Sequence, residues 1–332
     1  MNTAIPPRNF KRSHFFIRIG MTLAMLYVLV TLALMWWWNE EPDAFDPVVV
    51  AKQEAEARGQ RFVTGTVTTR TLIRVAQALL DKRGGYISND KLPPGLLLDN
   101  QPNWEFGVLV QVRDLSKAFR NDFSRVQTQS AEDVDLAEAD PLFSSPNDRW
   151  LLPSSERQFS KGIAHVEKYL ARLSDPTQST YFYPRADNLA DWLAVVEKRL
   201  GSLSQRLSAS AGRVAPEPTQ DGEPTLGPAF EQTPWLKIDD VFYEARGSTW
   251  ALLHFLKAVR VDFEPVLRDK NALVSLDQII RELEETQGAL HSPMVLNGTP
   301  FGMFANHSLV MANYISRANA AIMDLRLLLE RG

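Results

Sequence analysis

The chain has 332 residues, of which 45% are hydrophobic and 23% charged, and this composition is typical of a globular protein rather than a disordered or fibrous one. Its 36 basic residues nearly balance its 40 acidic residues, which argues against a nucleic-acid partner. No cysteine is present, so disulfides, thiolate metal sites and cysteine nucleophiles are excluded. The length suffices for one large or two modest domains.

A membrane-spanning helix is predicted at residues 19–38. The 20 residues of this run carry no charge, and a helix of that length spans roughly 30 Å, the thickness of a bilayer's hydrocarbon core. The run ends in three tryptophans, Trp36 to Trp38, whose rings favour the headgroup region. A cleaved signal peptide would need a small-residue cleavage site, and a buried soluble helix is rarely apolar on every face. A single-pass anchor is therefore the favoured interpretation.

The charges on either side of this run predict its direction. Residues 1–18 carry basic side chains and no acid, and residues 39–46 carry acids and no base. The positive-inside rule therefore places the 1–18 tail in the cytoplasm and the remainder of the chain across the membrane. Gly20 and Ala24 form a small-xxx-small pair, which could pack two anchors into a homo-oligomer, although such pairs also arise by chance.

Beyond residue 38, apolar residues recur at helical spacing in one segment after another. Examples begin at Val108, Phe159, Leu189, Leu273 and Met311. Each apolar stripe must be buried against another helix, so we predict an all-α, multi-helix bundle. Residues 62–69 are the only plausible short strand.

Proline divides this bundle in the sequence. Five prolines lie between residues 216 and 234, and proline breaks helices. We therefore predict a stalk at 39–59, a first helical block at 60–210, a proline-rich linker or loop at 211–235 and a second helical block at 236–332.

The two blocks contain a short internal repeat. Residues 117–126 and 257–266 both read K-A-x-R-x-D-F-x-x-V, and Gly107 and Gly247 stand in the same register. Self-similarity of this kind marks duplicated units, although one short window also arises by chance. Duplication predicts two related helical halves.

Three segments of the chain resemble one bacterial family. They are Phe242–Gly247 with Trp250–His254, then Arg185–Leu189 with Leu200–Ser208, and finally Asn306–Ala312. Together they resemble the family named domain of unknown function 2333, and the resemblance covers nearly the whole chain. It implies a bacterial protein with one N-terminal membrane helix, and it supplies no catalytic residue to carry over.

Motifs that carry chemistry are scarce. The five histidines show no metal-ligand spacing, and no nucleophile elbow or phosphate-binding loop occurs. We therefore expect no metal and no cofactor. A cluster of acids at 132–140 lacks the spacing of a calcium loop and is typical of a solvated surface, or of a docking site for a basic partner.

The segment 293–308 is the best candidate for a site, because it combines turn residues with large apolar side chains. It contains Phe301 and Phe304 and ends at Asn306, His307 and Ser308. Those last three residues stand at the start of a predicted helix, whose free N–H groups could bind an anion. Alternatively, Asn306 or Ser308 simply caps that helix. The expected charged neighbours of this segment are the following two residues: Glu244 and Arg246.

Three functional hypotheses remain open. The first is an inner-membrane protein whose periplasmic helical domain acts as an envelope scaffold or protein-interaction factor. The second is a hydrolase or lyase of cell-wall glycan, in which Glu244 works with His307; glycosidic chemistry would require two carboxylates at a cleft. The third is a sensor that binds a small ligand between the two blocks.

Overall fold

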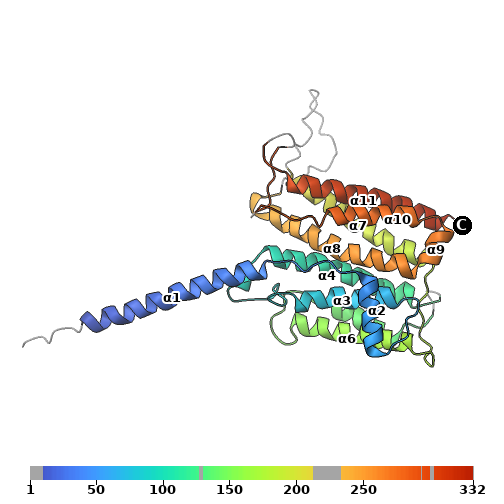
Figure 1. Ribbon diagram of the computed structural model, residues 1–332, viewed down its shortest axis with the longest axis horizontal. Coiled ribbons are helices and arrows are strands. Elements are labelled where there is room, and N and C mark those ends of the chain that lie inside the picture. The colour runs from blue at the N-terminus through green and yellow to red at the C-terminus, as the bar shows by residue number, and fades with distance from the viewer. Residues whose placement is uncertain (1–9, 127–129, 212–232, 293, 300–302, 332) are drawn as a thin grey trace, which may run out of the picture.

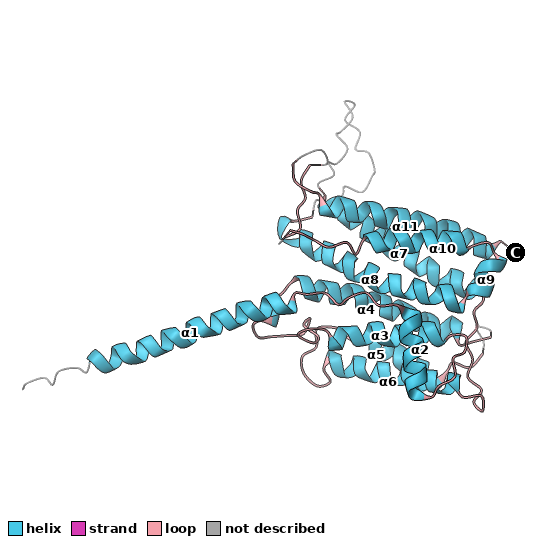
Figure 2. Cartoon of the chain, viewed as in Figure 1, coloured by secondary structure: helices cyan, strands magenta, loops and turns pink. Residues whose placement is uncertain are grey.

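The computed structural model describes residues 10–126, 130–211, 233–292, 294–299 and 303–331. Within these ranges the chain is helical apart from its connections, and its only β pairing is an isolated bridge between Asn297 and Asn306. The prediction of an all-α bundle is confirmed (Figure 2). The helices have these bounds: α1 Phe10–Trp38, α2 Pro47–Arg58, α3 Thr66–Asp81, α4 Asn100–Ala118, α5 Val134–Phe143, α6 Ser155–Ser174, α7 Ala186–Ser210, α8 Ile238–Asp262, α9 Glu264–Asp269, α10 Leu273–Glu285 and α11 His307–Glu330.

Helix α1 projects away from the bundle formed by the other helices (Figure 1). It begins at Phe10, nine residues before the predicted span, and its segment Phe15–Trp38 is long and apolar enough to cross a membrane. The side chains of this segment are almost all exposed, as expected of a helix whose surroundings are lipid.

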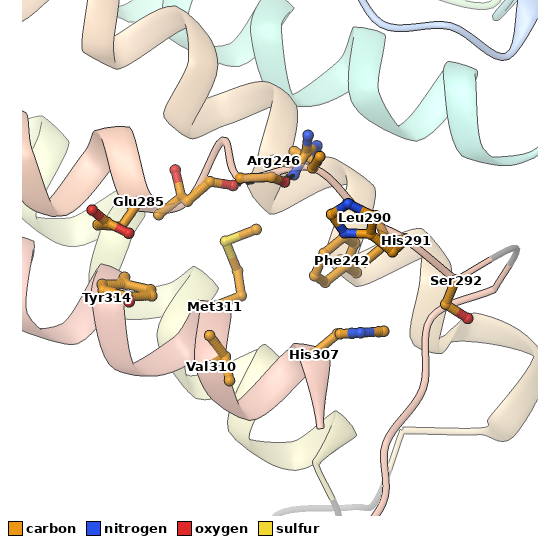
Figure 3. A pocket seen from close by; sticks show the side chains of 13 residues that line it. Phe242, Arg246, Glu285, Leu290, His291, Ser292, His307, Val310, Met311 and Tyr314 are labelled. Carbon is orange, nitrogen blue, oxygen red and sulfur yellow. Dashed lines mark hydrogen bonds between the residues drawn. The ribbon is translucent and has the colours of Figure 1, made fainter. Parts of the chain in front are cut away.

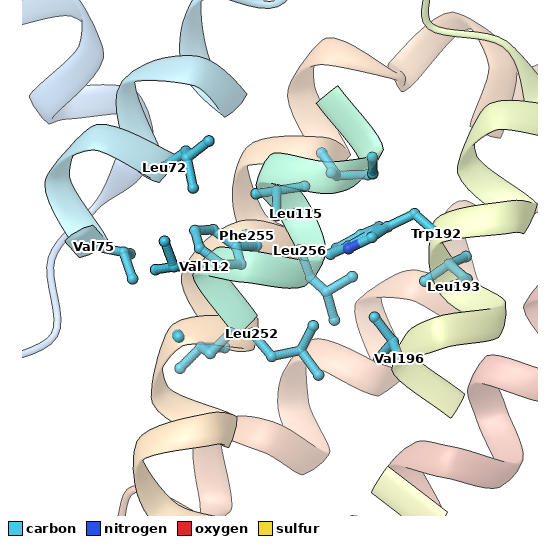
Figure 4. Close-up of a cluster of buried hydrophobic side chains, with 14 of the residues drawn as sticks. Leu72, Val75, Val112, Leu115, Trp192, Leu193, Val196, Leu252, Phe255 and Leu256 are labelled. Carbon is cyan, nitrogen blue, oxygen red and sulfur yellow. The ribbon is translucent and has the colours of Figure 1, made fainter. Parts of the chain in front are cut away.

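One hydrophobic core joins the helices of both predicted blocks. It extends from Leu72 on α3 to Leu329 on α11, and Figure 4 shows side chains of α3, α4, α7 and α8 meeting in it. Helix α7, which the sequence division assigns to the first block, packs along α11. The hydroxyls of Ser210 and Thr233, on either side of residues 212–232, are 2.9 Å apart. The described residues on either side of this segment therefore lie together, within a single packed body.

Helices α4 and α8 cross at two glycines that stand in register in the sequence repeat. A Cβ at Gly107 would lie 2.1 Å from the carbonyl oxygen of Glu244, and a Cβ at Gly247 would lie 2.1 Å from that of Trp104. The two backbones therefore touch, and only glycine allows this approach. Near their other ends, the rings of Phe123 and Phe263 are 5.2 Å apart.

These contacts relate the two halves in space. The two copies of the repeat are offset by 140 residues, so Gly107 corresponds to Gly247 and Phe123 to Phe263. Corresponding residues contact each other near both ends of α4 and α8. The two helices therefore run parallel and are related by a local pseudo-twofold axis. Helix α5 follows the first copy of the repeat and α10 follows the second, and each packs on the helix after it, α6 and α11. This arrangement supports the predicted pair of related helical halves.

The strand expected at 62–69 is wrong, because α3 begins at Thr66. A carboxylate distant in sequence, Asp262, accepts hydrogen bonds from the backbone N–H groups of Gly65 (2.8 Å) and Thr68 (2.7 Å) and from the Thr68 hydroxyl (2.7 Å). These bonds satisfy the free N–H groups of the first turn. The tertiary cap therefore outweighs the β propensity of the local Val and Thr residues.

Residues 39–59 are predicted as a stalk, and the structure places them against the bundle. Glu40 pairs with Arg83, Glu41 with Arg246 at 2.6 Å, and α2 packs on α3 and α8. The Phe45 ring stacks on the ring of His254, with centroids 4.1 Å apart. The anchor is therefore joined to the bundle by a docked strap, residues 39–46, and by α2.

This strap predicts a pH effect on stability. His254 accepts a hydrogen bond from the Phe45 N–H at Nε2 (3.0 Å), and its Nδ1 lies 2.7 Å from the Trp250 carbonyl, so the buried ring is neutral. Burial lowers its pKa from 6.5 to about 4. Between these values the unfolded chain binds a proton that the folded chain does not, so the stability that His254 contributes is present above about pH 6.5 and is lost as the pH falls toward 4.

We expect the free energy of unfolding of the full-length protein in detergent to fall by about 2 kcal/mol more between pH 7 and 4.5 than that of His254→Gln. The comparison with the variant separates His254 from buried carboxylates, which respond in the opposite direction. Parallel pH profiles for the two proteins would contradict the neutral, buried imidazole.

Candidate functional site

A cavity of about 440 Å³ opens between α8, the segment that follows α10 and the first turns of α11 (Figure 3). Its apolar lining comes from Phe242, Leu290, Val310, Met311 and Tyr314. Its polar side chains are Arg246, Glu285, Thr286, His291, Ser292 and His307. An apolar hollow with a few polar groups at its wall is the usual form of a binding site.

His307 reaches this cavity from the first turn of α11. The ring Nδ1 accepts a hydrogen bond from the Leu296 N–H at 2.9 Å. The backbone N–H of His307 donates to the Leu296 carbonyl at 2.8 Å. Burial lowers the pKa of the ring below its usual range. The imidazole is therefore neutral with its proton on Nε2, and the ring extends into the cavity as a hydrogen-bond donor (Figure 3).

Arg246 lines the same cavity, but its guanidinium group already forms an ion pair with Glu41. Its Nε lies 2.6 and 2.8 Å from the two carboxylate oxygens of Glu41 in the strap. Its Nη1 donates to the carbonyls of Thr286 (3.3 Å) and Gly288 (2.8 Å). Arg246 therefore joins the wall of the cavity to the strap at Glu41, three residues beyond the end of α1.

Asn306 caps α11, and the backbone N–H of Ser308 is bonded to the turn that precedes this helix. The Asn306 Oδ1 accepts from the Leu309 N–H at 2.8 Å and caps α11, while the Asn297 Oδ1 accepts from the Ser308 N–H at 3.2 Å. These side chains occupy the N–H groups that the sequence offers to an anion, so the capping alternative is the correct one. Asn297 also donates to the Ser210 carbonyl at 2.9 Å, which ties the turn before α11 to the end of α7.

The other sequence candidates lie apart from the cavity. Glu244 faces α7, where its two oxygens accept from the Arg206 guanidinium at 2.5 Å each, and it lines a separate hollow of about 320 Å³ between α4, α7 and α8. Phe304 is 71% exposed, and Phe301 lies outside the described residues. Of the six candidates that the structure describes, Arg246 and His307 line this cavity and the other four do not.

Sequence reasoning missed the apolar lining. Val310 and Tyr314 stand beside the buried stripe of α11 that contains Met311 and Ile315. A second apolar row beside the buried one makes the apolar face of α11 wider than packing against one neighbouring helix requires. This wide apolar face could have indicated a binding surface from the sequence.

The described lining of the cavity offers an apolar surface and the Nε2–H donor of His307. Among the described residues that line the cavity, Glu285 is the only acid, and Glu244 and His307, the pair of the hydrolase hypothesis, face different hollows. In the described part of the chain no group of three metal-ligating side chains occurs. The described lining of this cavity therefore offers no pair of carboxylates for glycosidic chemistry.

Comparison with known proteins places the chain in a family. No curated protein and no solved structure matches it. One family model does match, over residues 10–332, and its description is "Uncharacterized protein conserved in bacteria (DUF2333)". Because this match covers nearly the entire chain, including α1 and every helix of the bundle, the protein belongs to the bacterial family DUF2333.

Proposed function

We propose that this is an inner-membrane protein whose helical domain lies in the periplasm and binds another envelope protein through the α8–α11 cavity. The observation that carries the proposal is the Arg246–Glu41 ion pair, which links the wall of an apolar cavity to the strap directly after α1. A site held this close to the anchor suits a partner segment that lies near the same membrane.

The cavity lining suggests what that segment contains. The ring of Phe242 and the side chains of Leu290 and Met311 offer an apolar surface, and the His307 Nε2–H offers one donor. One or two large apolar side chains with a backbone carbonyl beside them would satisfy both. The occupant is therefore an apolar peptide segment of a protein rather than a charged metabolite.

The orientation follows from the charges that flank α1 and has its own test. The chain contains no cysteine, so single-cysteine variants report their compartment without background. In cells with a permeabilised outer membrane, a membrane-impermeant maleimide should label Val274→Cys, which is 76% exposed, and should label Thr3→Cys only after the inner membrane is broken. The reverse pattern would overturn the orientation.

The binding site has a matched pair of variants on one helix. Val310 is 53% exposed at the mouth of the cavity, and Met323 is 48% exposed elsewhere on α11. Val310→Arg places a charge where an apolar side chain should dock, so we expect it to lower the amount of co-purified partner about tenfold or more, whereas Met323→Arg leaves it unchanged.

The amount of partner recovered with each variant is measured by purifying the full-length protein in mild detergent and quantifying the co-purified proteins by mass spectrometry. Equal recovery of the partner with both would contradict the cavity as the contact. A wild-type protein that purifies alone would contradict the envelope-partner proposal and transfer weight to the small-ligand sensor hypothesis, for which thermal stabilisation by a ligand is the next measurement.

A further inference from the structure

Two loops lie at the end of the bundle that α1 joins (Figure 1). They are residues 82–99, between α3 and α4, and residues 144–154, between α5 and α6. The Trp38 ring lies against Gly84, since a Cβ there would be 2.8 Å from it, and Arg83 pairs with Glu40. The first loop therefore touches the last residue of α1.

The loops are held in place and to each other. The Tyr86 hydroxyl donates to the Asn147 carbonyl at 2.9 Å, and the Asn89 amide donates to the Arg149 carbonyl at 3.0 Å. The buried carboxylate of Glu105 accepts from the backbone N–H groups of Ile87 and Ser88, both at 2.8 Å. These bonds make the two loops one fixed surface.

That surface is unusually apolar for one exposed to water. In the first loop, Leu92, Leu96 and Leu97 are between 55% and 72% exposed. In the second, the consecutive residues Trp150, Leu151 and Leu152 are 53%, 65% and 84% exposed. A row of exposed leucines with a tryptophan marks an interaction site, and this combination is typical of segments that enter a membrane interface.

We propose that these six side chains form a second membrane contact, in which the two loops insert into the headgroup region of the bilayer that α1 spans. The occupant is lipid because the surface continues from Trp38, whose ring occupies the headgroup level when α1 spans the membrane. A basic side chain, Lys91, stands within the first loop and suits an anionic headgroup. The contact depends on α1 as an anchor and not on any partner in the α8–α11 cavity.

This contact has a structural consequence. With α1 alone, the bundle could rotate about the anchor; with the loops inserted beside it, the bundle is fixed at two places. The α8–α11 cavity, whose wall is joined to the strap, is then held at a constant height above the bilayer.

Depth-dependent quenching tests the contact in the full-length protein. Leu151→Cys and, in the other loop, Leu96→Cys are labelled with an environment-sensitive fluorophore and reconstituted into phosphatidylethanolamine–phosphatidylglycerol vesicles containing lipids with a shallow nitroxide. Trp36→Cys is the reference inside the interface. Val274→Cys is the control, because α10 begins near the Lys270–Arg331 contact at the opposite end of the bundle.

We expect labels at 151 and 96 to lose about half or more of their fluorescence, as the label at 36 does, while the label at 274 is barely affected. All four positions are exposed, so the labels leave the core intact. Quenching at 151 and 96 as weak as at 274 overturns the proposal. A label that is shielded from water yet unquenched also overturns it, because a protein surface, either a partner or a second copy, then covers the loops.

Discussion

Gly107→Ala and Gly247→Ala should each destabilise the protein by about 3 kcal/mol or more. Each added methyl group would lie 2.1 Å from a carbonyl oxygen of the facing helix, and a backbone oxygen cannot rotate away as a flexible side chain can. Helices α4 and α8 would have to separate, and they form the centre of the shared core. Denaturant unfolding of the full-length chain in detergent measures the effect.

Gly201 provides the control for this experiment. It lies within α7, and its nearest neighbour to an added Cβ is the Asn319 Nδ2 at 3.7 Å, an ordinary contact. Because alanine favours helix over glycine, Gly201→Ala should be neutral or stabilising by up to about 1 kcal/mol. If Gly107→Ala were as stable as Gly201→Ala, the close crossing of α4 and α8 would be wrong.

Glu105→Ala should cost about 3–5 kcal/mol, because it leaves a buried charge without its partner. The Lys82 Nζ lies 2.7 Å from the Glu105 carboxylate, and both side chains are almost fully buried. The same carboxylate accepts the Ile87 and Ser88 N–H groups, so its loss also frees the loop 82–99. Unfolding in denaturant measures the loss of stability. Quenching of a label at residue 96 by nitroxide lipid measures whether the loop 82–99 keeps its position.

A surface pair serves for comparison. Glu264 and Arg268 on α9 are 2.7 Å apart with side chains 44% and 69% exposed, so Glu264→Ala should change stability by about 0.5 kcal/mol or less. A cost for Glu105→Ala within that range would mean that Lys82 finds water when its partner is removed, contrary to its burial here.

The sequence alone predicts much of this fold because apolar periodicity is a local signal. The stripes that begin at Val108, Phe159, Leu189 and Met311 all lie on helices, and Ser154 and Asn306 cap α6 and α11. Periodicity says which face of a helix is buried but not against which helix. It therefore could not show that α7 packs on α11 rather than within the first block.

The candidate site was predicted only in part, for a related reason. Arg246 and His307 do line the same cavity. Glu244, however, is two residues from Arg246, and two residues turn a helix by about 200°. The two side chains therefore leave α8 on opposite sides, toward different hollows. The cap of α3 by Asp262 depends on a contact across nearly 200 residues, and no local pattern contains that information.

The most direct test of the proposed function is photo-crosslinking in intact cells, with p-benzoylphenylalanine at residue 310 in one strain and at residue 323 in another. Both positions are exposed on α11, and only residue 310 lines the cavity. Binding of an envelope protein in the cavity predicts a discrete crosslinked product at 310 that is absent at 323. No product at 310, or the same product at both positions, would contradict it.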